Sequence, residues 1–145
     1  METIKAQLIA NLLTQTNFSS SLLDVKKTIH KLKLQPSYPI ILVAGTNGKG
    51  SCCAYLSTIL SNAGYRVGTF TSPHVFEYNE RIAIENKPID DANLCQALQE
   101  VIAAAELNLG IFKTFTLAAH LIFARQQVDI AIVEVGIGGA QDATN

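Results

Sequence analysis

The sequence predicts an α/β fold in which helices flank a P-loop-type parallel sheet. Segments with a helical spacing of apolar residues alternate with short apolar runs that are typical of strands. One of these runs, residues 40–44, leads directly into a glycine-rich loop and then into a helical pattern. The chain has 145 residues, of which 48% are hydrophobic and 16% are charged. This is enough for one domain with a substantial core.

Two helices are predicted ahead of the first strand. Residues 3–14 and residues 21–33 both carry apolar side chains at helical spacing. These positions are Ile4, Leu8, Ile9 and Leu12 in the first segment and Leu22, Val25, Ile29 and Leu32 in the second. The stretch QPSYP at 35–39 breaks the second helix. The continuous apolar run at 40–44 is expected of a buried parallel strand.

The elements after the glycine-rich loop continue the alternation. A helix is predicted over 49–63, closed by Gly64, with a buried face made of Cys52, Leu56, Ile59, Leu60 and Ala63. The further elements are a strand at 65–70, a hairpin at 81–89 turning at Asn86–Lys87, helices from Asp90 or Asp91 to about Leu107 and over 114–127, and a strand at 128–135. This order predicts a doubly wound parallel sheet.

Composition limits the classes of partner. The net charge is −1, which gives no reason to expect nucleic acid or an anionic membrane as a partner. We interpret a small basic group as a solvated helix face; its members are Lys26, Lys27, His30, Lys31 and Lys33. No signal peptide or membrane-spanning run is recognisable. The cysteines Cys52, Cys53 and Cys95 lack metal-binding spacing, so we expect buried, reduced thiols in a cytoplasmic protein.

The loop GTNGKGS at 45–51 has the chemistry of a phosphate-binding loop. Glycines allow backbone N–H groups to approach a phosphate closely, and the following helix directs its positive end at the anion. Lys49 adds a full positive charge. The match to the generic P-loop pattern is imperfect, because Val43 stands at the first glycine position and Gly50 separates Lys49 from Ser51. On that pattern alone, a tight structural turn is the alternative.

Three blocks in order resemble the folylpolyglutamate synthases and dihydrofolate synthases of the Mur-type ATP-dependent ligases. VAGTNGKGS at 43–51 is similar to their P-loop. TSPHVFEYNERI at 71–82 is similar to their Ser-Pro-His loop, and VDIAIVEVGIGGAQDATN at 128–145 is similar to their strand and the glycine-rich turn after it. The resemblance covers nearly the whole chain.

The resemblance implies that the chain binds ATP and Mg²⁺. The implied ATP-binding residues are Thr46, Asn47, Gly48, Lys49, Gly50 and Ser51, with Lys49 as the catalytic residue. The implied Mg²⁺ ligands are Ser51, Ser72 and Glu134. The residue types suit this role, since Mg²⁺ takes oxygen ligands and a carboxylate at the end of an apolar strand is costly unless a cation meets it. The alternatives are a solvent-facing Glu134 and an ordinary Ser-Pro turn at Ser72.

The resemblance also implies a site for the pterin or folate, formed by Phe112, Lys113, Gln141, Asp142 and Ala143. Here the sequence departs from the family: Lys113 replaces the usual Glu, Ala140 replaces the usual Arg, and SSSLLDVKK lacks the usual Gly and Arg. A turn or N-cap role is the alternative for Asp142. For the histidines, we expect a loop-ordering role for His74, a core position for His120 and a surface position for His30.

The implied reaction is an ATP-dependent amide ligation of folate biosynthesis. ATP phosphorylates a carboxylate of dihydropteroate or (tetrahydro)folate, and the amine of L-glutamate then attacks the acyl phosphate. The sequence stops at the end of the third block, so we expect 1–145 to be a truncated N-terminal part of the ATP-binding domain. Without the C-terminal glutamate-binding domain, we expect a monomer that is inactive alone. The alternatives are a nucleotide-binding remnant without catalysis and an unrelated P-loop kinase or NTPase, against which the Ser-Pro-His block argues.

Overall fold

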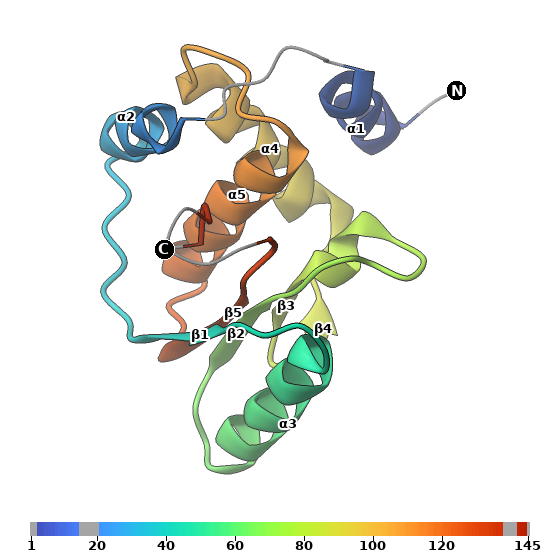
Figure 1. The fold of residues 1–145 in the computed structure, drawn as a ribbon, viewed down its shortest axis with the longest axis vertical. Helices are drawn as coiled ribbons and strands as arrows, with labels where there is room; N and C mark the ends of the chain where they lie inside the picture. The colour runs from blue at the N-terminus through green and yellow to red at the C-terminus, as the bar shows by residue number, and fades with distance from the viewer. Residues whose placement is uncertain (1–2, 15–20, 138–141, 145) are drawn as a thin grey trace.

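A computed structural model describes residues 3–14, 21–137 and 142–144 of the chain, and these form an α/β fold with helices on both faces of a sheet (Figure 1). The helices are α1 (Ile4–Thr14), α2 (Leu22–Leu32), α3 (Lys49–Asn62), α4 (Asp91–Ala104) and α5 (Ile111–Arg125), with a short 3₁₀ helix η1 (Tyr78–Arg81). The strands are β1 (Ile40–Val43), β2 (Val67–Phe70), β3 (Ile82–Ile84), β4 (Lys87–Pro88) and β5 (Ile130–Glu134).

The sheet is mixed rather than wholly parallel. Its strand order within the described residues is β1-β5-β2-β3-β4. Strands β1, β5 and β2 are parallel, as predicted, whereas β3 runs antiparallel to β2 and β4 antiparallel to β3. The prediction of a parallel sheet is therefore confirmed for β1, β5 and β2 and wrong for the pairing of β3 with β2. The antiparallel pair β3–β4 is the predicted hairpin, since a two-residue connection joins only antiparallel strands.

The hairpin turn lies one residue earlier than predicted. Glu85 and Asn86 have positive φ angles of 50° and 63°, and they form the turn in place of Asn86–Lys87. Two consecutive positive φ values suit the twist of a tight hairpin, and Asn tolerates them better than most residues.

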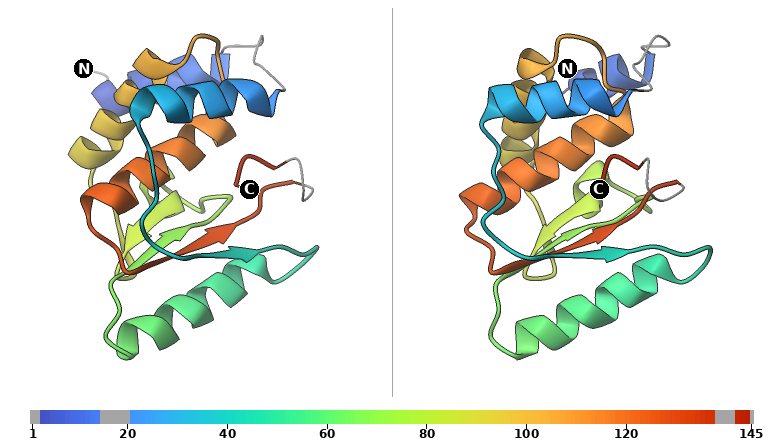
Figure 2. Two further views of the ribbon diagram at one scale, coloured as in Figure 1. Left: turned by 90° about the vertical axis from the view of Figure 1, so that its left-hand side faces the viewer. Right: turned by 60° about the vertical axis from the view of Figure 1, so that its left-hand side comes forward.

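The two faces of the sheet are covered unequally (Figure 2). Helix α3 lies alone on one face, and α1, α2, α4 and α5 form a layer on the other. The larger core cluster lies on the multi-helix side and includes Phe70, Leu98, Phe115 and Phe123, none of which is exposed. The core under α3 is smaller, with Val43, Cys53, Val67 and Ile132.

Helix α3 buries a different face from the one predicted. Cys53 and Ser57 are buried, with Leu56 and Leu60 packed against the small core, while Cys52 and Ile59 are exposed. The prediction placed apolar residues inward, but the Ser57 hydroxyl turns toward the sheet because it donates a hydrogen bond to the side-chain oxygen of Asn86. The same rotation exposes Cys52, which corrects the expectation of a buried thiol there.

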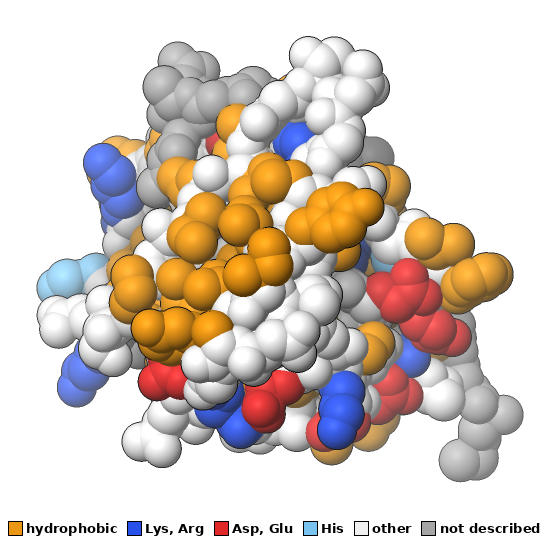
Figure 3. Space-filling model, turned by 90° about the horizontal axis from the view of Figure 1, so that it is seen from below, with side chains coloured by type: hydrophobic (Ala, Val, Ile, Leu, Met, Phe, Trp, Pro, Cys, Tyr) orange, Lys and Arg blue, Asp and Glu red, His pale blue; other side chains and the backbone are white. Residues whose placement is uncertain are grey.

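An apolar patch covers the outer side of α3 (Figure 3). Tyr55 and Ile59 are exposed apolar residues of α3. Ile40 and Leu42 on β1 are also exposed but face the other side of the sheet, because Ile41 and Val43, which alternate with them, pack under α3. Among the described residues, β1 pairs with β5 on one side only, so its other edge is open.

Helix boundaries follow the capping residues. The Asp90 carboxylate accepts a hydrogen bond from the Asn93 N–H (2.8 Å) at the start of α4, as predicted. Helix α5 begins at Ile111, three residues earlier than predicted, because Gly110 (φ 77°) provides the turn that starts it. His120 on α5 is a core residue, as expected.

Charged groups on the surface also match the prediction. The basic group on and after α2 is exposed, and Lys27 and Lys31 pair with Glu106. No helix in the described ranges is both long and apolar enough to cross a membrane.

Candidate functional site

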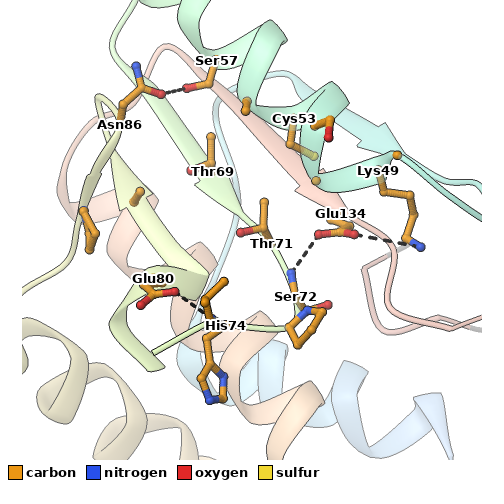
Figure 4. A pocket seen from close by; sticks show the side chains of 18 of the residues that line it. Lys49, Cys53, Ser57, Thr69, Thr71, Ser72, His74, Glu80, Asn86 and Glu134 are labelled. Atoms are coloured by element: carbon orange, nitrogen blue, oxygen red, sulfur yellow. Dashed lines mark hydrogen bonds and ion pairs between the residues drawn. The ribbon is translucent and has the colours of Figure 1, made fainter. Parts of the chain in front are cut away.

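Three chain segments meet at the carboxyl ends of the parallel strands. The register places Val43 of β1 beside Glu134 of β5, and Phe70 of β2 beside Val133 of β5. The residues that follow these strands therefore emerge at one edge of the sheet, where ligands bind in open α/β folds. This is why residues from the predicted loop, from Ser72 and from Glu134 lie together although they are far apart in the sequence (Figure 4).

The glycine-rich loop ends at the first turn of α3. Gly48 is the N-cap of the helix and has a φ of 75°, a conformation that favours glycine. The first N–H groups of a helix have no acceptor within the helix, so those after Gly48 are available to an anion. A Cβ at Gly50 would have no atom within 4 Å, which leaves the approach to these groups open.

Lys49 lies between the loop and the end of β5. Its ammonium donates a hydrogen bond to the Gly45 carbonyl (3.0 Å) and lies 4.0 Å from Oε1 of Glu134. A lysine held against its own loop in this way is positioned where an incoming phosphate would meet it.

Glu134 is a buried carboxylate, only 4% exposed. Its Oε2 accepts a hydrogen bond from the Ser72 N–H (2.8 Å), which ties the end of β5 to the segment after β2. The alternative of a solvent-facing Glu134 is therefore wrong. Burial of a carboxylate requires compensating partners, and Lys49 and the Ser72 N–H supply them here.

These groups line a cavity of about 690 Å³. Residues 46–51 of the loop, Thr71, Ser72, His74 and Glu134 line one part of it, and Ser57 and Asn86 line the part toward the hairpin. The size lies within the range of ordinary small-molecule sites. Cys53 forms part of the wall; burial, followed by the charge of Glu134, raises the pKa of its thiol to about 11. The thiol is therefore not a nucleophile at neutral pH.

A second cavity of about 500 Å³ adjoins the first through Lys49, Ser72 and Pro73, which line both. Its remaining lining residues are Arg81, Ile111, Phe112, Gly136, Ile137 and Asp142. Most of these side chains are apolar, so the second cavity suits an aromatic or aliphatic body rather than a polyphosphate.

Gly136 was not singled out by sequence reasoning, although it shapes this second cavity. A Cβ at Gly136 would lie 2.4 Å from the Phe112 ring, far inside van der Waals contact. Only glycine lets the chain after β5 pass this close to Phe112. The signal in the sequence is its place in the glycine-rich turn directly after a strand.

The residues predicted for the pterin or folate are brought together only in part. Phe112 and Asp142 line the second cavity. Lys113 and Ala143 line an adjacent cavity of about 330 Å³, which Phe112 and Asp142 also line. The Lys113 ammonium lies 3.5 Å from the carbonyl oxygen of Ser21. Gln141 and Ala140 lie outside the described residues.

Asp142 is 6% exposed, and its carboxylate is engaged by the surrounding backbone. It accepts hydrogen bonds from the Ile137 N–H (2.9 Å), the Thr144 N–H (3.0 Å) and the Thr144 hydroxyl (2.7 Å). This geometry agrees with the turn role that was the alternative for Asp142. It also fixes the residue at the wall shared by the two smaller cavities.

The loop between β2 and β3 is organised by Glu80, which sequence reasoning also missed. Its carboxylate accepts hydrogen bonds from the N–H groups of Val75 (2.8 Å), Phe76 (3.1 Å) and Glu77 (2.8 Å). These bonds, the one from Val75 most of all, lower the pKa of Glu80. The Ser72–Pro73 peptide bond at the start of this loop is cis.

His74 points away from Glu134 in the first cavity (Figure 4). Its Nδ1 accepts a hydrogen bond from Nε of Arg81 (3.0 Å), and its ring lies 4.0 Å from the Tyr78 ring, centroid to centroid. These contacts agree with the expected loop-ordering role. Arg81 itself was not anticipated from the sequence.

No protein-family model matches the chain. The chain is 41% identical over 122 residues to the dihydrofolate synthase/folylpolyglutamate synthase of Haemophilus influenzae, a match that covers 83% of this chain and 28% of that protein. The chain thus spans less than a third of this relative.

Solved structures give the same result over more of the chain. The Escherichia coli FolC protein in complex with DHPP and ADP matches with a TM-score of 0.90 and 34% identity, over 97% of this chain and 35% of that one. The bifunctional folylpolyglutamate synthase/dihydrofolate synthase of Yersinia pestis, complexed with AMPPNP and a Mn ion, matches with a TM-score of 0.91 and 35% identity over the same shares. By both sequence and fold, the chain belongs to the family of the folylpolyglutamate and dihydrofolate synthases.

Proposed function

We propose that the chain is the nucleotide-binding part of an ATP-dependent ligase that adds L-glutamate to a pterin- or folate-type carboxylic acid. The observation that carries this proposal is the junction of two cavities at Lys49 and Ser72. One cavity is polar and bounded by a phosphate-type loop, and the other is largely apolar. Such an arrangement brings the end of a polyphosphate to the carboxylate of an aromatic acid.

ATP would occupy the larger cavity with its phosphates against residues 46–51. The backbone N–H groups after Gly48 and the Lys49 ammonium would bind the phosphate oxygens, and Lys49 would exchange its bond to the Gly45 carbonyl for them. The ADP and AMPPNP in the structures of the two bacterial relatives support this placement.

The residues at the junction fit Mg²⁺. Glu134 is a buried carboxylate, and the hydroxyl-bearing residues Ser51 and Ser72 line the same cavity. The described residues hold no group of three His, Cys, Asp or Glu side chains that could bind a metal alone. This donor set suits Mg²⁺, which is usually held by one or two carboxylates together with waters and substrate phosphates. When bound, Mg²⁺ would offset the negative charge of the ATP phosphates.

The reaction would begin with attack by an oxygen of the acceptor carboxylate on the γ-phosphorus of ATP. The bond to the bridging oxygen breaks, ADP leaves, and an acyl phosphate forms. The glutamate amine then attacks the carbonyl carbon, and phosphate leaves from the tetrahedral intermediate. Lys49 would stabilise negative charge at the transferred group. The apolar walls of Phe112 and Ile111 would exclude water that could hydrolyse the acyl phosphate.

The isolated chain is proposed to bind its ligands without ligating them. It spans 28% of the length of the Haemophilus influenzae relative, and we assign the glutamate site to the part of the ligase that has no counterpart in this chain. A nucleotide-binding remnant without an acceptor is the second candidate. It is favoured by Lys113 and Ala140, which depart from the residues usual in the family at those positions.

The test is calorimetric titration of ATP with and without Mg²⁺, on the natural chain and on Glu134→Gln. We expect Mg²⁺ to strengthen binding to the natural chain about tenfold or more, and Glu134→Gln to abolish that gain, because the amide loses the charge that holds the ion. Absence of ATP binding by the natural chain would overturn the proposal. Titration of pteroate then separates the two candidates, since only the ligase interpretation requires it to bind.

A further inference from the structure

Arg81 has an environment unlike that of the other arginines. Arg66 pairs with Glu85 and Arg125 with Glu100, and the side chains of both are about 40% exposed. Arg81 is partly buried, and no carboxylate in the described ranges lies within ion-pair distance of it. Burial lowers the pKa of its guanidinium, although arginine keeps its charge in proteins. A partly buried cation without an anion carries a desolvation cost that no ion pair offsets.

The backbone of Arg81 is anchored to the sheet next to the proposed reaction site. Arg81 is the last residue of η1 and immediately precedes β3. Its carbonyl accepts a hydrogen bond from the Thr71 N–H (2.9 Å), one residue before Ser72. The position of Arg81 is therefore fixed relative to Ser72, which lines both cavities.

The side chain of Arg81 is also held in place. Its Cζ lies 5.5 Å from the centroids of both the Tyr78 and Phe115 rings, within cation–π range. Its Nε donates to Nδ1 of His74 (3.0 Å), which places the proton of the neutral His74 ring on Nε2, since arginine offers no acceptor. These contacts use the rings and Nε. The two terminal nitrogens have no hydrogen-bond partner within the described residues, and the side chain lines the second cavity.

The second cavity thus holds two cationic side chains on different elements. Lys49 lies at the junction with the ATP cavity, where the reacting carboxylate must lie. Arg81 lines the second cavity but not the first, whereas Ser72 and Pro73 line both. A single carboxylate at Lys49 leaves the paired N–H groups of Arg81 without an anion. A planar guanidinium with two free nitrogens matches a carboxylate in a bidentate geometry.

We propose that Arg81 binds a second, non-reacting carboxylate of the acceptor, and so favours acceptors that end in a dicarboxylic amino acid over acceptors with one carboxylate. The proposal rests on the proposed function, because it assumes that an acceptor acid occupies the second cavity. Dihydropteroate-type acids carry one carboxylate, whereas folate-type acids end in glutamate and carry two. Arg81 would recognise the carboxylate that remains free while the other is activated.

The test uses pteroate and folate, which share the ring system and differ in the terminal glutamate. Dissociation constants of both are measured by calorimetry on the 145-residue chain, on Arg81→Met and on Arg81→Lys. Methionine keeps an unbranched apolar side chain against Tyr78 and Phe115 and removes the charge, so it tests the guanidinium rather than the packing. Circular dichroism melts check that each variant folds. Arg66→Met, which removes an arginine at the surface, is the matched control.

We expect Arg81→Met to weaken folate binding about 10- to 100-fold, as for loss of a charged hydrogen-bonded contact, and to leave pteroate binding unchanged. Arg81→Lys should give a smaller loss for folate, because an ammonium keeps the charge without the bidentate geometry. Arg66→Met should change neither constant.

Equal effects of Arg81→Met on pteroate and folate would overturn the proposal and leave the proposed function intact, as would no effect on either. If the natural chain binds ATP but neither acid, both the acceptor site and the role of Arg81 are wrong. If Arg81→Met does not fold, Arg81→Lys serves as the test in its place. Its preference for folate over pteroate must then be smaller than that of the natural chain.

Discussion

The two cavities that meet at Lys49 are built in different ways. In the larger cavity, the ATP-side cavity of our proposal, residues 46–51 of one continuous loop line the part where phosphates would bind, and other segments, represented by Thr71, Asn86 and Glu134, complete it. The second cavity, the acceptor-side cavity of our proposal, is formed by side chains from separate segments, represented by Arg81, Phe112 and Ile137. A contiguous loop carries its chemistry in its sequence spacing. A cavity made of distant side chains depends on how the helices and strands pack.

The difference has a consequence for how each cavity tolerates change. A loop of N–H groups depends on glycine conformation and on one lysine, and is independent of the residues that form the larger core. The acceptor-side cavity borders that core directly, since Phe112 packs against it and lies 5.8 Å from Phe70, centroid to centroid. Substitutions there should alter binding and stability together. Substitutions in the loop that leave Lys49 in place should alter binding alone.

Lys49→Ala should give the largest effect and should separate the two cavities. Loss of the ammonium removes a charged contact to phosphate and leaves Glu134 buried without its cation. We expect ATP affinity to fall about 100- to 1,000-fold, as when one partner of a buried charge pair is truncated. Calorimetry measures the change. The exposed Lys87→Ala on β4 is the control and should bind ATP normally.

A histidine on α5, the helix that carries Phe112, should also make the free energy of unfolding depend on pH. His120 on α5 is 9% exposed and hydrogen-bonds to the Tyr38 hydroxyl (3.0 Å), and burial lowers its pKa to about 4. Below its ordinary pKa of about 6.5, the unfolded chain binds a proton that the folded chain does not. The stability that the neutral His120 contributes should therefore be fully present above pH 6.5. As the pH falls from 6.5 to 4, the free energy of unfolding should decrease by about 3 kcal/mol.

The measurement is urea denaturation across this pH range, with His120→Gln as the variant. Glutamine does not titrate, so its unfolding free energy should change less between the two pH values than that of the natural chain. His30→Gln, at an exposed position, should leave the pH dependence as it is. Parallel curves for the natural chain and His120→Gln would show that the buried ring is not the source.

A matched pair of glycine substitutions tests the comparison most directly. Gly136→Ala places a Cβ 2.4 Å from the Phe112 ring, so the ring or the turn must move. We expect a loss of about 1–3 kcal/mol in unfolding free energy, typical of overpacking, together with weaker pteroate binding and unchanged ATP binding. Gly50→Ala meets no atom within 4 Å and should not destabilise the fold.

The added methyl group of Gly50→Ala instead obstructs the phosphate approach, so ATP affinity should fall while pteroate binding stays unchanged. Chemical denaturation and calorimetry on both variants measure all four quantities. If Gly136→Ala weakens ATP and pteroate binding equally, the two cavities are not separable, and the contrast between them fails.

The sequence predicted the ATP side better than the acceptor side for physical reasons. The loop 45–51 is local, and apolar runs locate the ends of β1 and β5, so Lys49 and Glu134 could be placed at one edge in advance. The buried face of α3 could not be predicted, because a hydrogen bond from Ser57 to the distant Asn86 sets the rotation of the helix. The hairpin at 81–89 was predicted, but its antiparallel pairing with β2 was not, because the apolar pattern alone does not distinguish the two strand directions.

On the acceptor side, local patterns were insufficient. Arg81 is part of the block that resembles the family, but its sequence neighbours do not predict its burial, which depends on the packing of Phe115 beside Tyr78. Gly136 looked like one glycine among several until the Phe112 ring was placed against it. Both residues act through contacts with α5: Gly136 meets Phe112 and Arg81 meets Phe115, each more than 20 residues away in the sequence.

Lys113→Glu should give the smallest effect and tests the departure from the family at this position. Lys113 lines the cavity beside Phe112 and Asp142, at the edge of the proposed acceptor site, and its ammonium lies near the Ser21 carbonyl. A carboxylate at 113 offers an acceptor to the N–H donors of a pterin ring, whereas an ammonium repels them. We expect pteroate affinity to rise about two- to fivefold, the scale of one partly exposed hydrogen bond, with ATP affinity unchanged.

Lys26→Glu makes the same charge change on an exposed position of α2, so it should leave pteroate binding as it is. A rise of pteroate affinity in both variants would trace the effect to net charge. A fall of pteroate affinity in Lys113→Glu would mean that the lysine itself contacts the acceptor. The acceptor would then carry a negative group at that end rather than the donors of a pterin.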